Sequence, residues 1–118
     1  MMYKVEAIVR EEKLEDIKAA LDKIEVNGVT VSQVMGFGVQ RGYHSVVRGQ
    51  EVDVMMQPKI KFEIVVSSEE WKDKTVKALM EEAKTGEIGD GKIFVYEIKE
   101  AINIRTGETG YDALQSTI

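Results

Sequence analysis

Apolar residues recur at every second position in four short stretches of the chain. These stretches cover residues 2–9, 29–34, 59–66 and 93–98, and several of them are rich in valine and isoleucine. Alternation of this kind is typical of strands that bury one face. The pattern therefore predicts four strands, and a further short apolar run predicts a fifth over residues 101–104.

Two other stretches repeat their apolar residues at spacings of three and four, which predicts amphipathic helices. The first follows Glu11 and Glu12, ends at Asn27-Gly28 and carries a stripe of Leu14, Ile17, Leu21 and Ile24. The second begins after Ser67 or Ser68, either of which can cap the helix, and has Glu69 and Glu70 in its first turn. Its stripe consists of Val76, Leu79, Met80 and Ala83.

The resulting order βαββαβ predicts an α+β, ferredoxin-like fold: a four-stranded antiparallel sheet with two helices on one face. A chain of 118 residues fits one such domain. The other face of the sheet would carry Lys59, Lys61 and Glu63, with Ile8 and Val65 among them. Because this face has part of an apolar surface, we expect it to meet a copy of itself.

The connection between the second and third strands is unusually long. It covers about twenty residues from Gly36 to Gln57, whereas hairpin connections have about two to five. Long connections of this kind serve a function or are disordered.

Composition excludes several kinds of site. The chain has 16 Lys and Arg against 21 Asp and Glu, a net charge of −5, so bulk electrostatics do not favour direct nucleic-acid binding. It has no cysteine and one histidine, His44, which argues against disulfides, thiolate chemistry and a zinc site. No apolar run approaches membrane-spanning length and no signal peptide is evident, so we expect a cytoplasmic protein.

The stretch most suggestive of chemistry is the glycine-rich segment 85–92, Thr-Gly-Glu-Ile-Gly-Asp-Gly-Lys. Consecutive amides without side chains can form a nest for an anion, and the Lys92 ammonium would add a positive charge. The segment differs from a P-loop because Ile93 replaces the metal-binding hydroxyl and because the loop runs from a helix into a strand. A simple helix C-cap and turn is the alternative interpretation.

Four segments together resemble the PII nitrogen-regulatory signalling proteins of the GlnB/GlnK type. These segments are residues 31–40, 58–66, 85–95 and 104–108, and they occur in the same order as in that family. The resemblance implies a homotrimer that binds ATP or ADP in clefts between subunits. It also implies a T-loop at about 38–57, a B-loop at about 85–92 and a C-terminal segment at about 103–118.

The resemblance assigns nucleotide-binding roles to three groups of residues. The B-loop positions Gly89, Asp90, Gly91 and Lys92 would surround the phosphates, and Arg105 would reach them across the subunit boundary. Positions Gly36, Phe37, Gly38, Val39 and Gln40 would flank the nucleotide, and Ile8, Thr30, Glu63 and Val65 would surround adenine and ribose. Val39 and Asn103 stand where many family members have arginine, and Glu87 where lysine is common, so we expect weaker or differently selective nucleotide binding.

The resemblance also implies further ligands and a partner. Gln40 and Lys59 match positions that bind 2-oxoglutarate beside Mg-ATP, with the Gln40 amide oxygen as a ligand for Mg²⁺. The T-loop residues Arg48, Gly49 and Glu51 would contact partners. Val52 and Gln50 replace the tyrosine and serine that are modified in other members, a pattern most like GlnK proteins of low-GC Gram-positive bacteria.

The expected partner is an ammonium transporter of the AmtB type, a transcriptional regulator or a metabolic enzyme, with membrane contact only through the transporter. Two alternatives stay open. One is a PII-like adenylate energy sensor without a 2-oxoglutarate response. The other is a small enzyme that hydrolyses a phosphoanhydride in the same cleft. The nucleotide sensor that performs no catalysis is the principal prediction.

Overall fold

The computed structural model describes residues 1–26, 28–37, 45–47, 50–52 and 56–114. The strands are β1 (Met2–Arg10), β2 (Val29–Gly36), β3 (Ser45–Val47), β4 (Gln50–Val52), β5 (Gln57–Val66) and β6 (Gly91–Ile98). The helices are α1 (Leu14–Lys23) and α2 (Glu69–Ala83), and short 3₁₀ turns cover Glu11–Lys13 and Asp112–Leu114.

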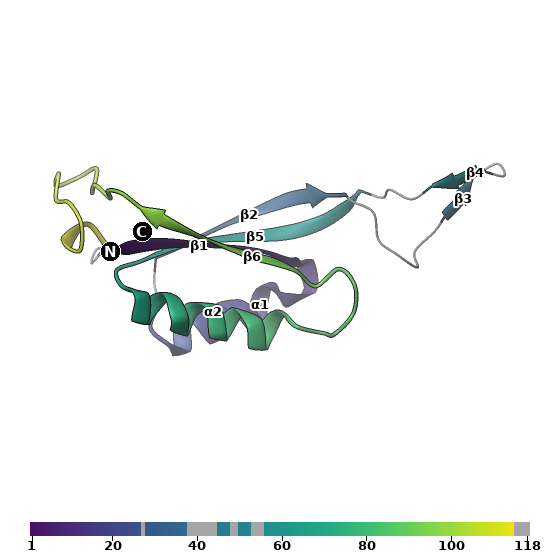
Figure 1. The fold of residues 1–118 in the computed structure, drawn as a ribbon, viewed down its shortest axis with the longest axis horizontal. Helices are drawn as coiled ribbons and strands as arrows, with labels where there is room; N and C mark the ends of the chain where they lie inside the picture. The colour runs from purple at the N-terminus through teal and green to yellow at the C-terminus, as the bar shows by residue number, and fades with distance from the viewer. Residues whose placement is uncertain (27, 38–44, 48–49, 53–55, 115–118) are drawn as a thin grey trace.

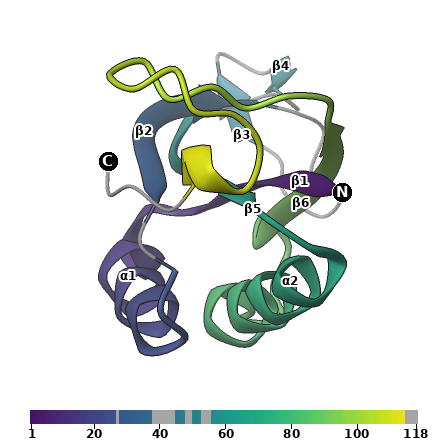
Figure 2. The same ribbon diagram turned by 90° about the vertical axis from the view of Figure 1, so that its left-hand side faces the viewer.

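The main sheet confirms the predicted ferredoxin-like arrangement. Its strand order is β2-β5-β1-β6, and every neighbouring pair is antiparallel. Both helices cover the same face of the sheet and lie next to each other, as Figures 1 and 2 show. Among the described residues, no helix covers the opposite face of the sheet, which is called the open face below.

The core forms where the apolar face of the sheet packs against the apolar stripes of the two helices. Alternate residues of β1 and β5 point toward the helices, and the buried set is Val5, Ala7, Val9, Ile60, Phe62, Ile64 and Val66. The helices contribute Ile17, Leu21, Leu79 and Ala83 to the same cluster. The register explains this agreement, because Ala7 lies opposite Phe62 and Val5 opposite Ile64. The alternation of apolar and polar residues in β1 and β5 therefore determines which face of the sheet the helices cover.

Helix boundaries follow local chemistry. At the start of α2 the Ser68 hydroxyl accepts a hydrogen bond from the Trp71 amide at 3.2 Å, which settles the choice between the two predicted serine caps. Helix α1 ends at Lys23, and Glu25 adopts a left-handed φ of 65°. The helix thus stops a few residues before Asn27-Gly28, where the sequence predicted its end.

Two parts of the predicted topology need correction. The fifth strand over 101–104 is wrong, because only an isolated bridge between Ile102 and Thr109 forms there. The physical reason is a turn: the Asn103 side-chain oxygen accepts hydrogen bonds from the amides of Arg105 and Thr106, which folds the chain back. The long connection, for which the sequence predicts no strand, contains a small antiparallel pair of β3 with β4.

The open face of the sheet carries a network of charges across three strands. Lys4 pairs with Glu63 at 2.8 Å, and Lys61 pairs with Glu6 at 3.0 Å. The Tyr96 hydroxyl donates a hydrogen bond to Glu6 at 2.8 Å. These contacts confirm that the predicted polar residues of β5 share this face. Phe94 and Tyr96 also lie here and remain 44% and 47% exposed, so the face keeps a partly apolar character in the single chain.

Candidate functional site

The glycine-rich loop connects α2 to β6 and lies at the end of the sheet from which the long connection departs (Figure 1). Gly86, Gly89 and Gly91 all have left-handed φ values, between 91° and 103°. Gly91 also lies against the β1 backbone, since a Cβ atom there would stand 1.8 Å from the Ile8 carbonyl oxygen. The loop therefore requires glycine for its own bends and for its contact with the sheet.

The Asp90 carboxylate ties the loop together from within. It accepts hydrogen bonds from the amides of Thr85 and Gly86, each at 2.9 Å, and from the Thr85 hydroxyl. The Arg10 guanidinium donates to the same carboxylate at 3.0 Å from the end of β1. The Thr85 hydroxyl and these other donors hold the pKa of Asp90 well below its usual range. Asp90 is thus an ionised internal anion of the loop.

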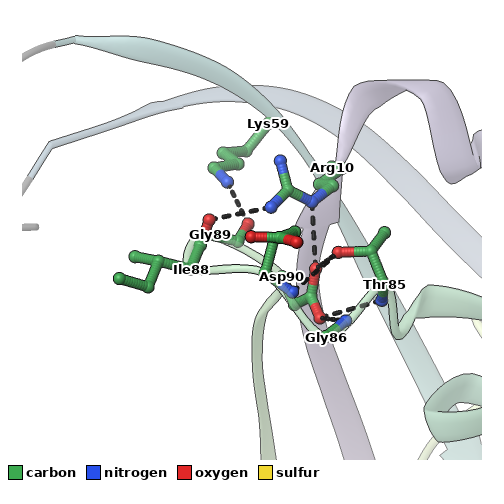
Figure 3. Close-up of polar contacts among 8 residues, drawn as sticks. Arg10, Lys59, Thr85, Gly86, Ile88, Gly89 and Asp90 are labelled. Carbon is green, nitrogen blue, oxygen red and sulfur yellow. Dashed lines mark hydrogen bonds and ion pairs between the residues drawn. The ribbon is translucent and has the colours of Figure 1, made fainter. Parts of the chain in front are cut away.

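Two cations from the sheet face the loop backbone (Figure 3). Arg10 donates a second hydrogen bond to the Ile88 carbonyl at 2.8 Å, and Lys59 donates to the Gly89 carbonyl at 2.6 Å. The two residues are partners in the β1–β5 register, so the sheet places them side by side. With Lys92, the second residue of β6, three positively charged residues contact the loop or directly follow it. An anionic ligand is what such a set can hold.

One group of the predicted nucleotide-binding positions gathers around this loop. Ile8 lies opposite Lys92 in the β1–β6 pairing, and Gly36 ends β2 at the same end of the sheet. Phe37 follows Gly36 and is 67% exposed. The structure thus places at the same end of the sheet Ile8, Gly36, Phe37, Lys59, Gly89, Asp90, Gly91 and Lys92.

A second group lies away from the loop. Thr30 is the register partner of Glu63, and Val65 follows farther along β5 on the open face. Asn103 and Arg105 lie beyond the far end of β6. β6 has eight residues and spans about 23 Å at a rise of about 3.3 Å per residue, and it lies between the loop and the segment that contains Arg105. Figure 1 shows the two segments at opposite ends of the sheet, so one chain does not unite both groups.

Several predicted residues lie outside the described part of the chain. These are Gly38, Val39, Gln40, Arg48 and Gly49. Glu51 belongs to strand β4.

Sequence reasoning missed Arg10 and Thr85. The predicted first strand ended one residue before Arg10. Nothing in the local pattern indicates that Arg10 contacts a loop 78 to 80 residues away in the chain. Thr85 was noted only as the first residue of the glycine-rich segment. A polar residue that flanks such a segment is a weak signal for an internal hydrogen bond.

Other parts of the described surface do not add to this site. A groove of about 500 Å³ between α1 and β2, lined in part by Leu21, Val26, Val29 and Val31, contains none of the predicted site residues. Within the described ranges, no group of three or more His, Cys, Asp or Glu residues could hold a metal ion. No helix in that part of the chain is long and apolar enough to cross a membrane.

Comparison with known proteins agrees with this fold. The family model "Nitrogen regulatory protein P-II" matches residues 2–108. The P-II protein of Pasteurella multocida is 48% identical over 113 residues, which cover 96% of this chain and 100% of that protein. P-II 1 of Methanothermobacter thermautotrophicus is 49% identical over 96% of this chain and 97% of that protein.

Solved structures give the same result. The B. subtilis GlnK-ATP complex superposes with a TM-score of 0.77 at 41% identity and covers 95% of this chain and 96% of that one. The Arabidopsis thaliana PII structure with bound citrate has a TM-score of 0.75 at 43% identity, covering 95% and 91%. By fold and sequence the chain thus falls in a class of regulatory proteins. It belongs to the nitrogen regulatory protein P-II family.

Proposed function

We propose that this protein is a non-enzymatic signalling protein that binds ATP or ADP and transmits nucleotide occupancy to a partner through residues 38–57. The observation that carries the proposal is the glycine loop at one end of the sheet, where Lys59 donates to the Gly89 carbonyl and Lys92 follows the loop in β6. A polyphosphate is the adenine-nucleotide group that such a loop would hold. The similarity to the GlnK-ATP complex supports ATP as the ligand.

The distribution of the predicted residues supports a site shared between copies. The loop and Arg105 lie at opposite ends of β6, so a single chain cannot place both on one nucleotide. A neighbouring copy can supply Arg105, and with it Thr30, Glu63, Val65 and Asn103. A cyclic homotrimer, with one such cleft at each of its three interfaces, accounts for this separation. The partly apolar open face supplies the surface on which copies would pack.

The proposed output is the long connection between β2 and β5. Its hairpin stands away from the main sheet in Figure 1, where a partner could reach it. We place Arg48, Gly49 and Glu51 in the partner contact, and the partner we propose is an ammonium transporter of the AmtB type, a transcriptional regulator or a metabolic enzyme. A ligand would shift this segment only by binding its two conformations with different affinities.

The connection also begins within reach of the nucleotide loop. Gly36 and Phe37 precede the segment that contains Gln40, and Lys59 follows it in β5. We propose that Mg²⁺, held in part by Gln40, and 2-oxoglutarate, paired with Lys59, join the bound ATP there. Lys59 now donates to the Gly89 carbonyl, so a dicarboxylate would have to compete for that ammonium.

Calorimetric titration tests the ligands. We expect ATP and ADP to bind in the micromolar range, and Lys92→Ala to weaken ATP about tenfold or more through loss of a charged contact. Lys99→Ala, which removes an exposed lysine just beyond β6, should bind ATP as the unmodified protein does. Absence of ATP and ADP binding would refute the proposal. Titration with Mg-ATP, with and without 2-oxoglutarate, distinguishes the nitrogen-responsive form from an adenylate sensor without that response.

Turnover separates the sensor from the hydrolase alternative. The proposed sensor releases phosphate from ATP no faster than a buffer control. Linear phosphate release that is abolished by Lys92→Ala would contradict the proposal and favour the phosphoanhydride hydrolase.

A further inference from the structure

We propose that Arg10 is a positioning residue for the nucleotide loop: by holding the Asp90 carboxylate and the Ile88 carbonyl, it keeps residues 85–92 in the shape that receives a polyphosphate. This inference rests on the proposed function and assigns a role to a residue outside the expected ligand-contacting set. Arg10 would act through the loop and not by contact with the nucleotide.

The first support is the direction of the Asp90 side chain. A carboxylate beside a polyphosphate repels it, yet the loop includes an aspartate among its glycines. In the structure this carboxylate is turned into the loop, where the amides of Thr85 and Gly86, the Thr85 hydroxyl and the Arg10 guanidinium all donate to it. Of these donors Arg10 is the one that carries a positive charge, so its removal would leave the negative charge of the carboxylate uncompensated and the loop held by fewer contacts.

The second support is the geometry of Arg10. Its Nε donates to Asp90 and its Nη2 to the Ile88 carbonyl, at 3.0 and 2.8 Å, so one planar group fixes two points of the loop. The Arg10 and Asp90 side chains are each only 23% exposed, which limits competition from water. A lysine could keep one of these contacts but not both, because its ammonium lacks the two-pronged guanidinium shape.

The third support is the cost of ordering the loop. Gly86, Gly89 and Gly91 give the free loop many accessible conformations, and binding would have to remove that freedom. Contacts that hold the loop before the ligand arrives reduce this cost. Arg10 is suited to the task because it projects from the end of β1, the strand paired on both sides in the sheet.

The test is a double-mutant cycle read by ATP titration. We expect Arg10→Met to weaken ATP binding about tenfold, Arg10→Lys to have an intermediate effect, and Lys23→Met, an exposed lysine on α1, to have none. In an Asp90→Asn background, Arg10→Met should cost much less than in the unmodified protein, since the two residues act together. Equal losses in both backgrounds, or normal ATP binding by Arg10→Met, would overturn the inference.

Hydrogen–deuterium exchange of the ligand-free protein provides a second readout. The Arg10→Met substitution should accelerate exchange in peptides covering 85–92 and leave those covering 60–66 of β5 unchanged. If exchange in the loop is unaffected, Arg10 does not position it and the inference is wrong. Should Arg10→Met fail to fold, Arg10→Lys carries both measurements. If the unmodified protein itself binds no ATP, the proposed function fails, while the exchange data still report whether Arg10 orders the loop.

Discussion

Single residues decide whether the glycine loop can form at all. Gly91 has a φ of 102° and no space for a Cβ, because the Ile8 carbonyl lies in its path. Asp90 contributes differently, since its carboxylate satisfies backbone donors that a sharp turn would leave exposed. The conformation of the loop therefore depends on the absence of a side chain at Gly91 and on the hydrogen bonds of the Asp90 side chain.

Substitution of Gly91 by alanine tests this dependence. We expect Gly91→Ala to lower the free energy of unfolding by about 1–3 kcal/mol, because the left-handed backbone is strained and the new methyl group meets the Ile8 carbonyl. Gly28→Ala is the matched control, since nothing lies within 4 Å of its Cβ position. Denaturant titration measures both variants. A Gly91→Ala protein as stable as the control would contradict the described loop geometry.

The sequence predicts some of the loop's important residues and not others. The glycines and Lys92 were found because their clustering is local and their chemistry is distinctive. The inward hydrogen bonds of Asp90 were not predicted, because the sequence does not determine whether an aspartate side chain in a loop faces solvent, a ligand or the loop backbone. Arg10 was missed because its importance depends on the pairing of β1 with β5 and on a loop far along the chain.

At the scale of elements, the open face of the sheet is held by charges that cross from strand to strand. Glu6 of β1 accepts from Tyr96 of β6 and pairs with Lys61 of β5. The Tyr96 hydrogen bond and then the Lys61 ammonium lower the pKa of Glu6 below its ordinary value of 4.5. Because the folded state favours ionised Glu6, this group stabilises the fold above its unfolded pKa, and the contribution is lost as the pH falls through the folded value.

Glu6→Gln should therefore have a pH-dependent effect. We expect the variant to melt a few degrees below the unmodified protein at pH 7, and the difference to shrink as the pH falls below 4.5. Glu100→Gln removes an exposed carboxylate beyond β6 and should show no such trend. Thermal melts followed by circular dichroism between pH 7 and pH 3 give the comparison. A melting difference that stays constant with pH would argue against an ionised Glu6 at the centre of the network.

The main elements were predictable because each has a periodicity of its own. Alternation in 59–66 and the apolar stripes of the two helices led directly to β5, α1 and α2. The β3–β4 pair was missed because three-residue strands are too short for a period to be recognised. The false fifth strand came from the apolar run at 101–104, where the Asn103 side chain instead builds a turn.

At the scale of the whole molecule, the predicted nucleotide site is divided between two ends of one chain. The residues around the glycine loop lie at one end of the sheet, and the segment with Asn103 and Arg105 lies at the other. The length of β6 separates them. No local pattern in the sequence could reveal this separation, because it follows from the direction of β6 in the folded sheet. The assignment of both groups to one ligand came from the family resemblance, and the separation of the two groups favours the proposed site shared between two chains.

Mixed oligomers test this central claim. Lys92→Ala and Arg105→Ala should each lose most ATP binding when present alone. When the two variants are coexpressed with different tags and the mixed oligomers are purified, each mixed trimer has one interface at which an intact loop meets an intact Arg105 from the neighbour, so about a third of the sites should be intact. Calorimetry should then recover that fraction of the binding sites at the affinity of the unmodified protein. If verified mixed oligomers recover no ATP binding, or if the protein is monomeric while binding ATP, the shared-site account is wrong.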